Sequence, residues 1–205
     1  MFIKKMSVKS IFEDSKENIW IGTWNAGVYL FDRQSYKTTR YKRVESKFGI
    51  TAFEEDNEGN IWISTWDGDF LYCLLEPDKF DSEKVKLIPA RGFNSVLPDP
   101  VIYDLMFDDE HGCLWVSTAN GIVVMNLSES KEKYTYFKSD ELGGVEAMFL
   151  MKAENGTIWS GIEGSGLSSF VYRDDFYSHS VPDVAKDQVV TALYEDEDSL
   201  IWIRF

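Results

Sequence analysis

Histidine and cysteine are scarce in this chain, with two of each among its 205 residues. Cys73 and Cys113 lack the spacing of a metal site and fall in the middle of expected strands, so we expect two buried thiols and no disulfide. His111 and His179 have no serine or cysteine at the spacing of a nucleophilic motif. We therefore expect no catalytic residue, no metal and no cofactor.

Basic residues are also few. The chain has 21 Lys and Arg against 35 Asp and Glu, which gives a formal net charge of −14. Nucleic-acid binding depends on clusters of Lys and Arg, so we expect no nucleic-acid partner. No apolar run approaches the roughly 18 residues of a membrane span, and Met1–Met6 lacks the apolar stretch of a secretory signal. We expect no membrane contact by this segment, and a signal, if the protein is exported, outside it.

What the chain does contain is an internal repeat centred on tryptophan. The segment NIWIGT at 18–23 returns as NIWIST at 60–65, CLWVST at 113–118, TIWSGI at 157–162 and LIWI at 200–203. The tryptophans are 42, 53, 44 and 43 residues apart, which is the period of one four-stranded propeller blade. One blade cannot bury both of its faces alone, so the repeat predicts blades stacked side by side.

Each repeat is expected to begin with a hairpin that ends on its tryptophan. The second unit has apolar residues twelve and nine positions before Trp62, an Asp six before and a Gly three before: Ile50, Phe53, Asp56 and Gly59. A carboxylate at the start of a tight turn accepts backbone N–H bonds, and Gly supplies the positive φ. The third unit has Asp109 at the aspartate position. Departures from the pattern are Glu17 and Ser199 at the glycine position and Ala153 at the aspartate position.

The remaining strands complete the prediction of an all-β fold. The consecutive apolar residues Ile19–Trp20–Ile21 indicate a strand covered on both faces, a third strand begins with Gly27 or Gly121, and the fourth is more polar. We predict part of a single β-propeller, with four complete blades plus half of a fifth and the first strand of each unit lining the axis. The repeats run at about 8–45, 50–90, 101–139, 145–181 and 189–205, and residues 89–100 are expected to form an inter-blade loop.

The pattern resembles the two-component regulator propeller repeat, through VKSIFEDSKENIWIGTWNAGVYLFD and ITAFEEDNEGNIWISTWDGDFLY above all. The resemblance implies the periplasmic sensor region of a hybrid two-component system, a class common in gut Bacteroidetes, where it regulates polysaccharide use. It therefore implies a non-catalytic, ligand-sensing ectodomain of an inner-membrane histidine kinase, with an oligosaccharide as the favoured ligand and the rest of the kinase as a partner.

Such sensors carry many more repeats than this chain does. An open arc of blades exposes two apolar faces, which favour association. We therefore expect either a fragment of a larger sensor or self-association through the open blade faces. Phe2–Met6 is expected to be the outer strand of a blade whose inner strands come from elsewhere.

The candidate binding surface is the face on which the loops after the tryptophan strands and the inter-blade loops emerge together. It combines aromatic rings for the apolar faces of sugars with polar groups for their hydroxyls. Its residues are Trp24, Asn25, Trp66, Asp67, Arg91, Phe93, Asn94, Asn120 and Glu163. The alternative is that Trp24 and Trp66, which share one repeat position, only pack between blades, although Ala119 and Glu163 at that position show that the fold does not require Trp there.

The acidic turns at 56–60 and 108–112 fail the EF-hand pattern, so we assign them no calcium. Two other functions stay open for this fold. One is a protein–protein interaction scaffold, and the other is a propeller lyase or glycosidase.

Overall fold

The structure is a computed structural model of the chain. It describes residues 7–41, 49–66, 71–75, 86–89, 91–127, 133–173, 176–180, 182 and 188–205. The expected outer strand at Phe2–Met6 lies outside these residues, as does the candidate site residue Asp67.

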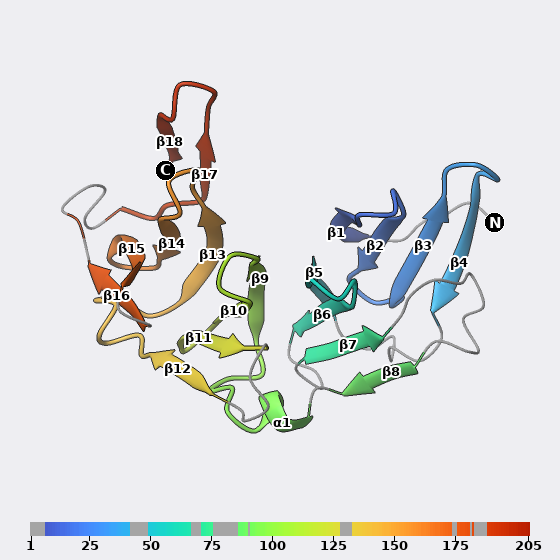
Figure 1. Cartoon of the computed structure of the whole chain (residues 1–205), viewed down its shortest axis with the longest axis horizontal. Helices are drawn as coiled ribbons and strands as arrows, with labels where there is room; N and C mark the ends of the chain where they lie inside the picture. The colour runs from blue at the N-terminus through green and yellow to red at the C-terminus, as the bar shows by residue number, and fades with distance from the viewer. Residues whose placement is uncertain are drawn as a thin grey trace.

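The described residues form four antiparallel sheets of four strands and a final two-stranded hairpin, with neighbouring strands in sequence order (Figure 1). Blade 1 contains β1 (Val8–Glu13), β2 (Ile19–Thr23), β3 (Val28–Asp32) and β4 (Lys37–Tyr41). Blade 2 contains β5 (Gly49–Glu55), β6 (Ile61–Trp66), β7 (Leu71–Leu75) and β8 (Lys86–Pro89). Blade 3 contains β9 (Ile102–Asp108), β10 (Cys113–Thr118), β11 (Gly121–Asn126) and β12 (Tyr134–Phe137). Blade 4 contains β13 (Ala147–Lys152), β14 (Ile158–Ile162), β15 (Gly166–Arg173) and β16 (Phe176–Ser180). The final hairpin contains β17 (Ala192–Glu195) and β18 (Ile201–Arg204).

The blades stand side by side in an arc, which confirms the all-β, partial propeller fold (Figure 1). The first strands β1, β5, β9 and β13 lie at the inner edge of the arc, and the fourth strands lie at its outer edge. The arc is open between β1 and the final hairpin.

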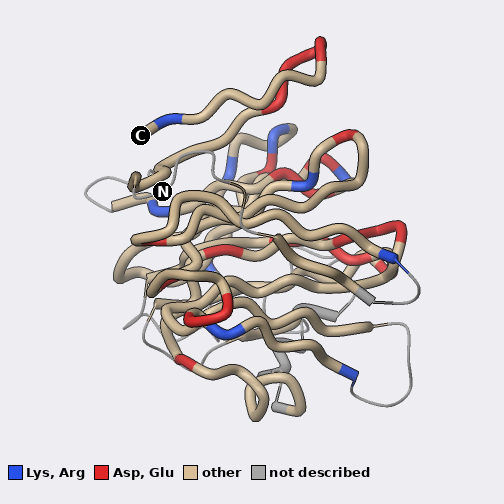
Figure 2. The backbone as a smooth tube through the Cα atoms, turned by 90° about the vertical axis from the view of Figure 1, so that its left-hand side faces the viewer, with Lys and Arg blue, Asp and Glu red and all other residues tan. Residues whose placement is uncertain are grey.

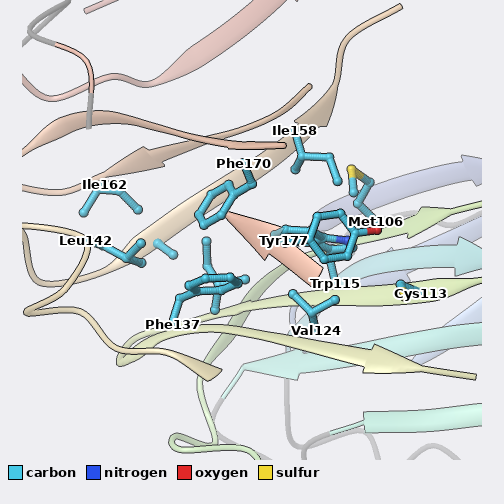
Figure 3. Packing of buried hydrophobic residues seen from close by; sticks show 12 residues of the cluster. Met106, Cys113, Trp115, Val124, Phe137, Leu142, Ile158, Ile162, Phe170 and Tyr177 are labelled. Atoms are coloured by element: carbon cyan, nitrogen blue, oxygen red, sulfur yellow. The ribbon is translucent and has the colours of Figure 1, made fainter. Parts of the chain in front are cut away.

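The apolar core lies between the blades rather than within them. One buried cluster joins blades 1 and 2 through Trp20, Ile50 and Ile63, and a second joins blades 2 and 3. A third packs Trp115 of blade 3 against Phe170 of blade 4, with ring centroids 5.1 Å apart (Figure 3). The tryptophan strands β6 and β10 of the two middle blades are therefore covered on both faces, as their consecutive apolar residues predict, whereas Ile19 and Ile21 of β2 are only half-buried. Trp202 of the final hairpin has a blade on one side only and is 62% exposed.

A hydrogen bond between the turn aspartate and its tryptophan, present in blades 1 and 2 and in the final hairpin, explains the six-residue spacing of the repeat. The indole Nε1–H donates to the second carboxylate oxygen of the aspartate, over 2.9 Å from Trp20 to Asp14, 2.9 Å from Trp62 to Asp56 and 2.6 Å from Trp202 to Asp196. The first carboxylate oxygen accepts two backbone N–H groups of the turn, as in all three of these turns. The sequence predicted these backbone bonds but not the indole bond.

In blade 3 the prediction of Asp109 as the turn aspartate is wrong by one position. Asp108 pairs with Cys113, and Met106 pairs with Trp115, so this turn is one residue longer than the turn of blade 1. Asp108 therefore takes the buried position, and Asp109 is exposed. The aspartate spacing failed here because the inserted residue lies inside the turn.

Backbone angles confirm the role of the glycine position. Its five residues all have positive φ, at 63° for Glu17, 78° for Gly59, 63° for Gly112, 80° for Gly156 and 58° for Ser199. Two turns therefore hold a residue with a side chain in a conformation that favours glycine.

The inter-blade segment contains one turn of helix, α1 (Arg91–Asn94), where the sequence predicted only loop. Phe93 packs its ring edge-to-face on Trp62, with centroids 5.6 Å apart. The Asn94 side chain accepts the backbone N–H of Leu71 over 3.1 Å and donates to its carbonyl over 3.2 Å. These contacts fasten the helix to blade 2.

The two cysteines match their expectation, since both thiols are buried and neither is in a disulfide. Among the described residues, no helix has the length and hydropathy of a membrane-spanning segment.

Candidate functional site

The two ends of the blades differ in chemistry. We call the end with the aspartate turns the turn face, and the opposite end, where each second strand finishes and each first strand begins, the loop face. In Figure 2 the acidic turn between β17 and β18 projects at the upper right, so the turn face lies on the right of that view. Part of the candidate set lies on the loop face, because each of its members follows the end of a second strand by one or two residues. These members are Trp24, Asn25, Asn120 and Glu163.

Buried threonines shape the loop-face turns. The Thr23 hydroxyl donates to the Gly27 carbonyl over 2.8 Å and accepts the Ala26 N–H over 2.9 Å. Thr118 makes the same pair of bonds, to the Gly121 carbonyl over 2.9 Å and from the Asn120 N–H over 3.1 Å. Because the threonine hydroxyls fix these turns, Asn25 and Asn120 do not take part in holding them, and both residues are exposed at the tips of the turns.

Three aromatic side chains from three blades form a continuous row on this face, which we call the aromatic row: Trp24, Trp66 and Tyr103. The rings of Trp24 and Trp66 are 5.8 Å apart between centroids and inclined by 49°. Trp66 meets Tyr103 edge-to-face at 5.1 Å. Trp24 remains 43% exposed, so the row presents ring surface to solvent.

Glycine at the start of β5 makes room for the first ring of the row. A Cβ at Gly49 would stand 2.8 Å from the ring carbon Cε3 of Trp24, closer than side-chain carbons approach. The backbone of Trp24 is held as well, because its N–H donates to the Ser7 carbonyl over 2.9 Å. Trp24 is therefore fixed against blade 2 and does not extend freely from its turn.

Two carboxylates, those of Glu146 and Glu163, lie at the Tyr103 end of the row. The Tyr103 hydroxyl donates to Glu146, directly before β13. Burial raises the pKa of Tyr103 above its usual value, and the bond to Glu146 and the charges of Glu163 and Asp99 raise it further, so the phenol stays protonated. Glu163 directly follows β14 and lies beside Glu146. Two backbone bonds of 2.9 Å join the segments, from Val145 N–H to the Glu163 carbonyl and from Glu163 N–H to the Glu146 carbonyl.

The structure brings together part of the candidate set. Trp24 and Trp66 are in contact, and Tyr103 and Glu146 connect them to Glu163. Phe93 and Asn94 instead pack against blade 2, and Arg91 contributes the first residue of α1. Asn120 uses its carbonyl to accept the Tyr136 hydroxyl over 2.6 Å.

Sequence reasoning missed Tyr103 and Glu146 as members of the site. Tyr103 was counted only as the apolar residue that begins the repeat, where the other units have Val8, Ile50, Ala147 and Val190. A single phenol among four aliphatic residues was the available signal. For Glu146, outside the repeat pattern, no signal was available.

The turn face carries a second polar cluster, around Asp108. Its Oδ2 atom contacts His111 Nδ1 at 2.7 Å and accepts the Tyr177 hydroxyl over 2.5 Å, and its Oδ1 atom accepts Lys152 Nζ over 2.6 Å. Burial opposes the charge of Asp108, yet the hydrogen bonds from Lys152, Tyr177 and His111 hold its pKa below the usual value. Although Asp108, Glu110 and His111 lie close enough to share an ion, Lys152 already supplies the positive charge, and we assign no metal to this cluster.

Comparisons with known proteins agree with this architecture. Residues 3–25 and 49–67 match the family model described as the two component regulator propeller. The chain is similar to an extracellular domain assigned to the hybrid two-component system BT3049 of B. thetaiotaomicron, with a TM-score of 0.76 and 22% identity over 96% of this chain and 26% of that chain. This chain thus spans about a quarter of that structure.

Propellers with other functions have the same fold. Virginiamycin B lyase from Staphylococcus aureus matches with a TM-score of 0.70 and 12% identity, over 99% of this chain and 64% of that chain. PorZ, a component of the type-IX secretion system of Porphyromonas gingivalis, matches with a TM-score of 0.68 and 14% identity, over 96% of this chain and 30% of that chain. A search of curated proteins found no match. At these identities the structural likeness shows the fold alone.

Proposed function

Because this chain carries repeats of the two-component regulator propeller family, we propose that it is a ligand-sensing, non-catalytic segment of a hybrid two-component sensor. We place it on the periplasmic side of the inner membrane, with the rest of the sensor kinase as its partner. We further propose that its ligand is a carbohydrate and that it binds on the loop face.

The aromatic row is the observation that carries this proposal. Sugars are held by aromatic rings against their apolar C–H faces, and by carboxylates and amides on their hydroxyls. The row offers Trp24 with 43% of its surface exposed, and Glu163 is exposed beyond Tyr103. Rings from three blades are also well placed for signalling, since a ligand that spans them changes the relative stability of blade arrangements if it binds one arrangement more tightly.

The placement of the histidines supports a non-catalytic role. His111 lies on the turn face, where it contacts Asp108, and its ring is 3.8 Å from that of Tyr172 between centroids. His179 lies in the outer strand β16 and contacts Phe137 and Phe170. Neither histidine belongs to the loop face.

A protein-binding scaffold is the second candidate, because apolar side chains are exposed at both ends of the arc. Ile11 of β1 is 68% exposed, and Trp202 of β18 and Phe205 directly after it are each 62% exposed. Such surfaces favour association with further blades, with a second copy or with another protein.

The test is calorimetric titration of the chain with a panel of plant and host oligosaccharides. We expect Trp24→Ala to weaken binding by about tenfold, as loss of one stacked ring costs roughly 1–1.5 kcal/mol. Tyr134→Ala is the matched control, because Tyr134 is 51% exposed in the outer strand β12, away from the row. A bound oligosaccharide whose affinity is the same in wild type and Trp24→Ala would exclude the aromatic row as its site. A stable protein partner without any glycan binding would favour the scaffold.

A further inference from the structure

We propose that the loop face selects a saccharide that carries protonated amines over neutral or acidic saccharides. This inference rests on the carbohydrate recognition proposed above and adds the charge of the ligand. It is drawn from the carboxylates that surround the end of the aromatic row.

Two of these carboxylates come from neighbouring strand ends. Glu146 and Glu163 stand directly opposite on neighbouring strands, one residue beyond the pair of Ala147 and Ile162. Like charges at directly opposed positions destabilise a sheet. Arg33 pairs with Glu13, and Lys152 pairs with Asp108 and Asp109 on the turn face, so neither of these cations neutralises Glu146 or Glu163.

A third carboxylate adds to the negative charge at this end of the row. Asp99 is held in place by accepting the Val101 N–H over 2.8 Å. Its charge acts on the Tyr103 hydroxyl together with the charges of Glu146 and Glu163, and all three oppose ionisation of that phenol. Asp99, with Asp140 and Glu141, has the same effect on Tyr136. The loop face around Tyr103 therefore has a negative potential within a chain of net charge −14.

The aromatic row adds an attraction for cations that is independent of these carboxylates. The face of an indole ring attracts an ammonium group, more strongly than a phenol or phenyl ring does. Trp24 and Trp66 lie next to one another and lead to Tyr103 and Glu146. An amino sugar stacked on this row would place its ammonium groups between ring faces and carboxylates, whereas a uronic acid would bring a further negative charge to Glu163.

The test compares three probes that differ mainly in charge: a glucosamine hexasaccharide with free amines, its fully N-acetylated form and a hexasaccharide of uronic acid. Titrations at pH 5.5 and low salt keep the amines of the first probe protonated. We expect the free-amine form to bind on the order of tenfold more tightly than the N-acetylated form. The difference should shrink strongly near 1 M NaCl, where the screening length is about 3 Å.

Variants assign the effect to the site. Glu163→Gln removes one opposed charge and leaves the bond of Tyr103 to Glu146, and we expect it to reduce the preference for the free amine severalfold. Glu110→Gln removes an equal charge from the turn face and should leave the preference unchanged. Equal binding of the first two probes, or tightest binding of the uronic acid, overturns the charge inference and leaves carbohydrate recognition intact. If no saccharide of this panel or the preceding one binds, carbohydrate recognition itself is refuted.

Discussion

The substitution Ala153→Asp should stabilise the protein, because it supplies the aspartate that the turn of Trp159 lacks. Trp159 Nε1 is buried and has no hydrogen-bond partner among the described residues. The backbone of this turn already has the required shape. Its two closing bonds, Ala153 N–H to the Thr157 carbonyl at 2.8 Å and Gly156 N–H to the Ala153 carbonyl at 2.9 Å, correspond to bonds of 3.0 and 2.9 Å in the turn of Asp14.

The size of the gain follows from the turn of blade 1. Asp14 is buried, with 5% exposure, and accepts the Trp20 indole over 2.9 Å, while Ala153 is equally buried at 2%. A hydrogen bond to a charged group contributes about 1.5–3 kcal/mol, and burial of the new carboxylate and its repulsion by the nearby Glu195 offset part of this. We therefore expect the free energy of unfolding to rise by about 1 kcal/mol, and the melting temperature by roughly 2–4 °C.

Urea unfolding followed by tryptophan fluorescence measures this change, with Ala153→Asn as the matched control. The amide has nearly the same shape but no charge, so it should give a smaller gain. The pH dependence supplies a second criterion. The indole bond lowers the pKa of Asp196 in the final hairpin, and the introduced carboxylate should be affected in the same way. A lowered folded pKa means that the gain is present above the unfolded value of about 3.9 and is lost as the pH falls below it. An unchanged or lower urea midpoint at pH 7 would refute the structural role assigned to the indole bond.

Three further substitutions test other parts of the fold. Glu17→Gly replaces a side chain at φ 63° and should raise the free energy of unfolding by about 0.5–1 kcal/mol in urea titrations, so a lower midpoint would contradict the strain argument. Tyr177→Phe removes the hydroxyl that donates to Asp108 and should lower that free energy by about 1–3 kcal/mol; an effect within error would mean that the contact is dispensable. Burial raises the pKa of Glu54 to about 8. Because the folded pKa lies above the unfolded one, stability falls as the pH rises from about 4 to 8. Glu54→Gln should therefore stabilise the protein more at pH 9 than at pH 5, and an equal effect at both would disprove the shift.

The sequence predicted the blades because their defining residues repeat. The apolar triplets around Trp20 and Trp62 indicate strands covered on both faces, and the structure places both side chains in clusters shared by two blades. Errors arose where one unit departs from the others. The extra turn residue in blade 3 shifted the aspartate from Asp109 to Asp108, and α1 occupies a segment without repeat spacing.

The contacts between blades could not be predicted from the sequence, since each depends on two units at once. The Glu55 carboxylate of blade 2 accepts the Ser15 N–H of blade 1 over 2.6 Å, and Glu195 of the final hairpin accepts the Glu154 N–H of blade 4 over 2.7 Å. Both bonds join the same pair of repeat positions. Between blades 3 and 4 the corresponding position is Lys152, which binds Asp108 and Asp109 instead. One junction is thus held by opposite charges where two others use a carboxylate and a backbone N–H. Between blades 2 and 3 the Asn57 amide donates instead to the Asp109 carbonyl over 3.1 Å.

This division of labour between the two ends of the blades argues for function on the loop face. On the turn face, Asp14, Asp56 and Asp196 form the bonds that build their hairpins, and Asp108 joins blade 3 to blade 4. On the loop face, threonine hydroxyls fix the turns of blades 1 and 3, and the position that holds Trp24, Trp66, Ala119 and Glu163 differs between blades. Packing between blades explains why part of the Trp24 side chain is buried, but it does not explain why 43% of its surface remains exposed to water. Differences confined to a position that the fold does not constrain are what a binding surface assembled from several blades requires.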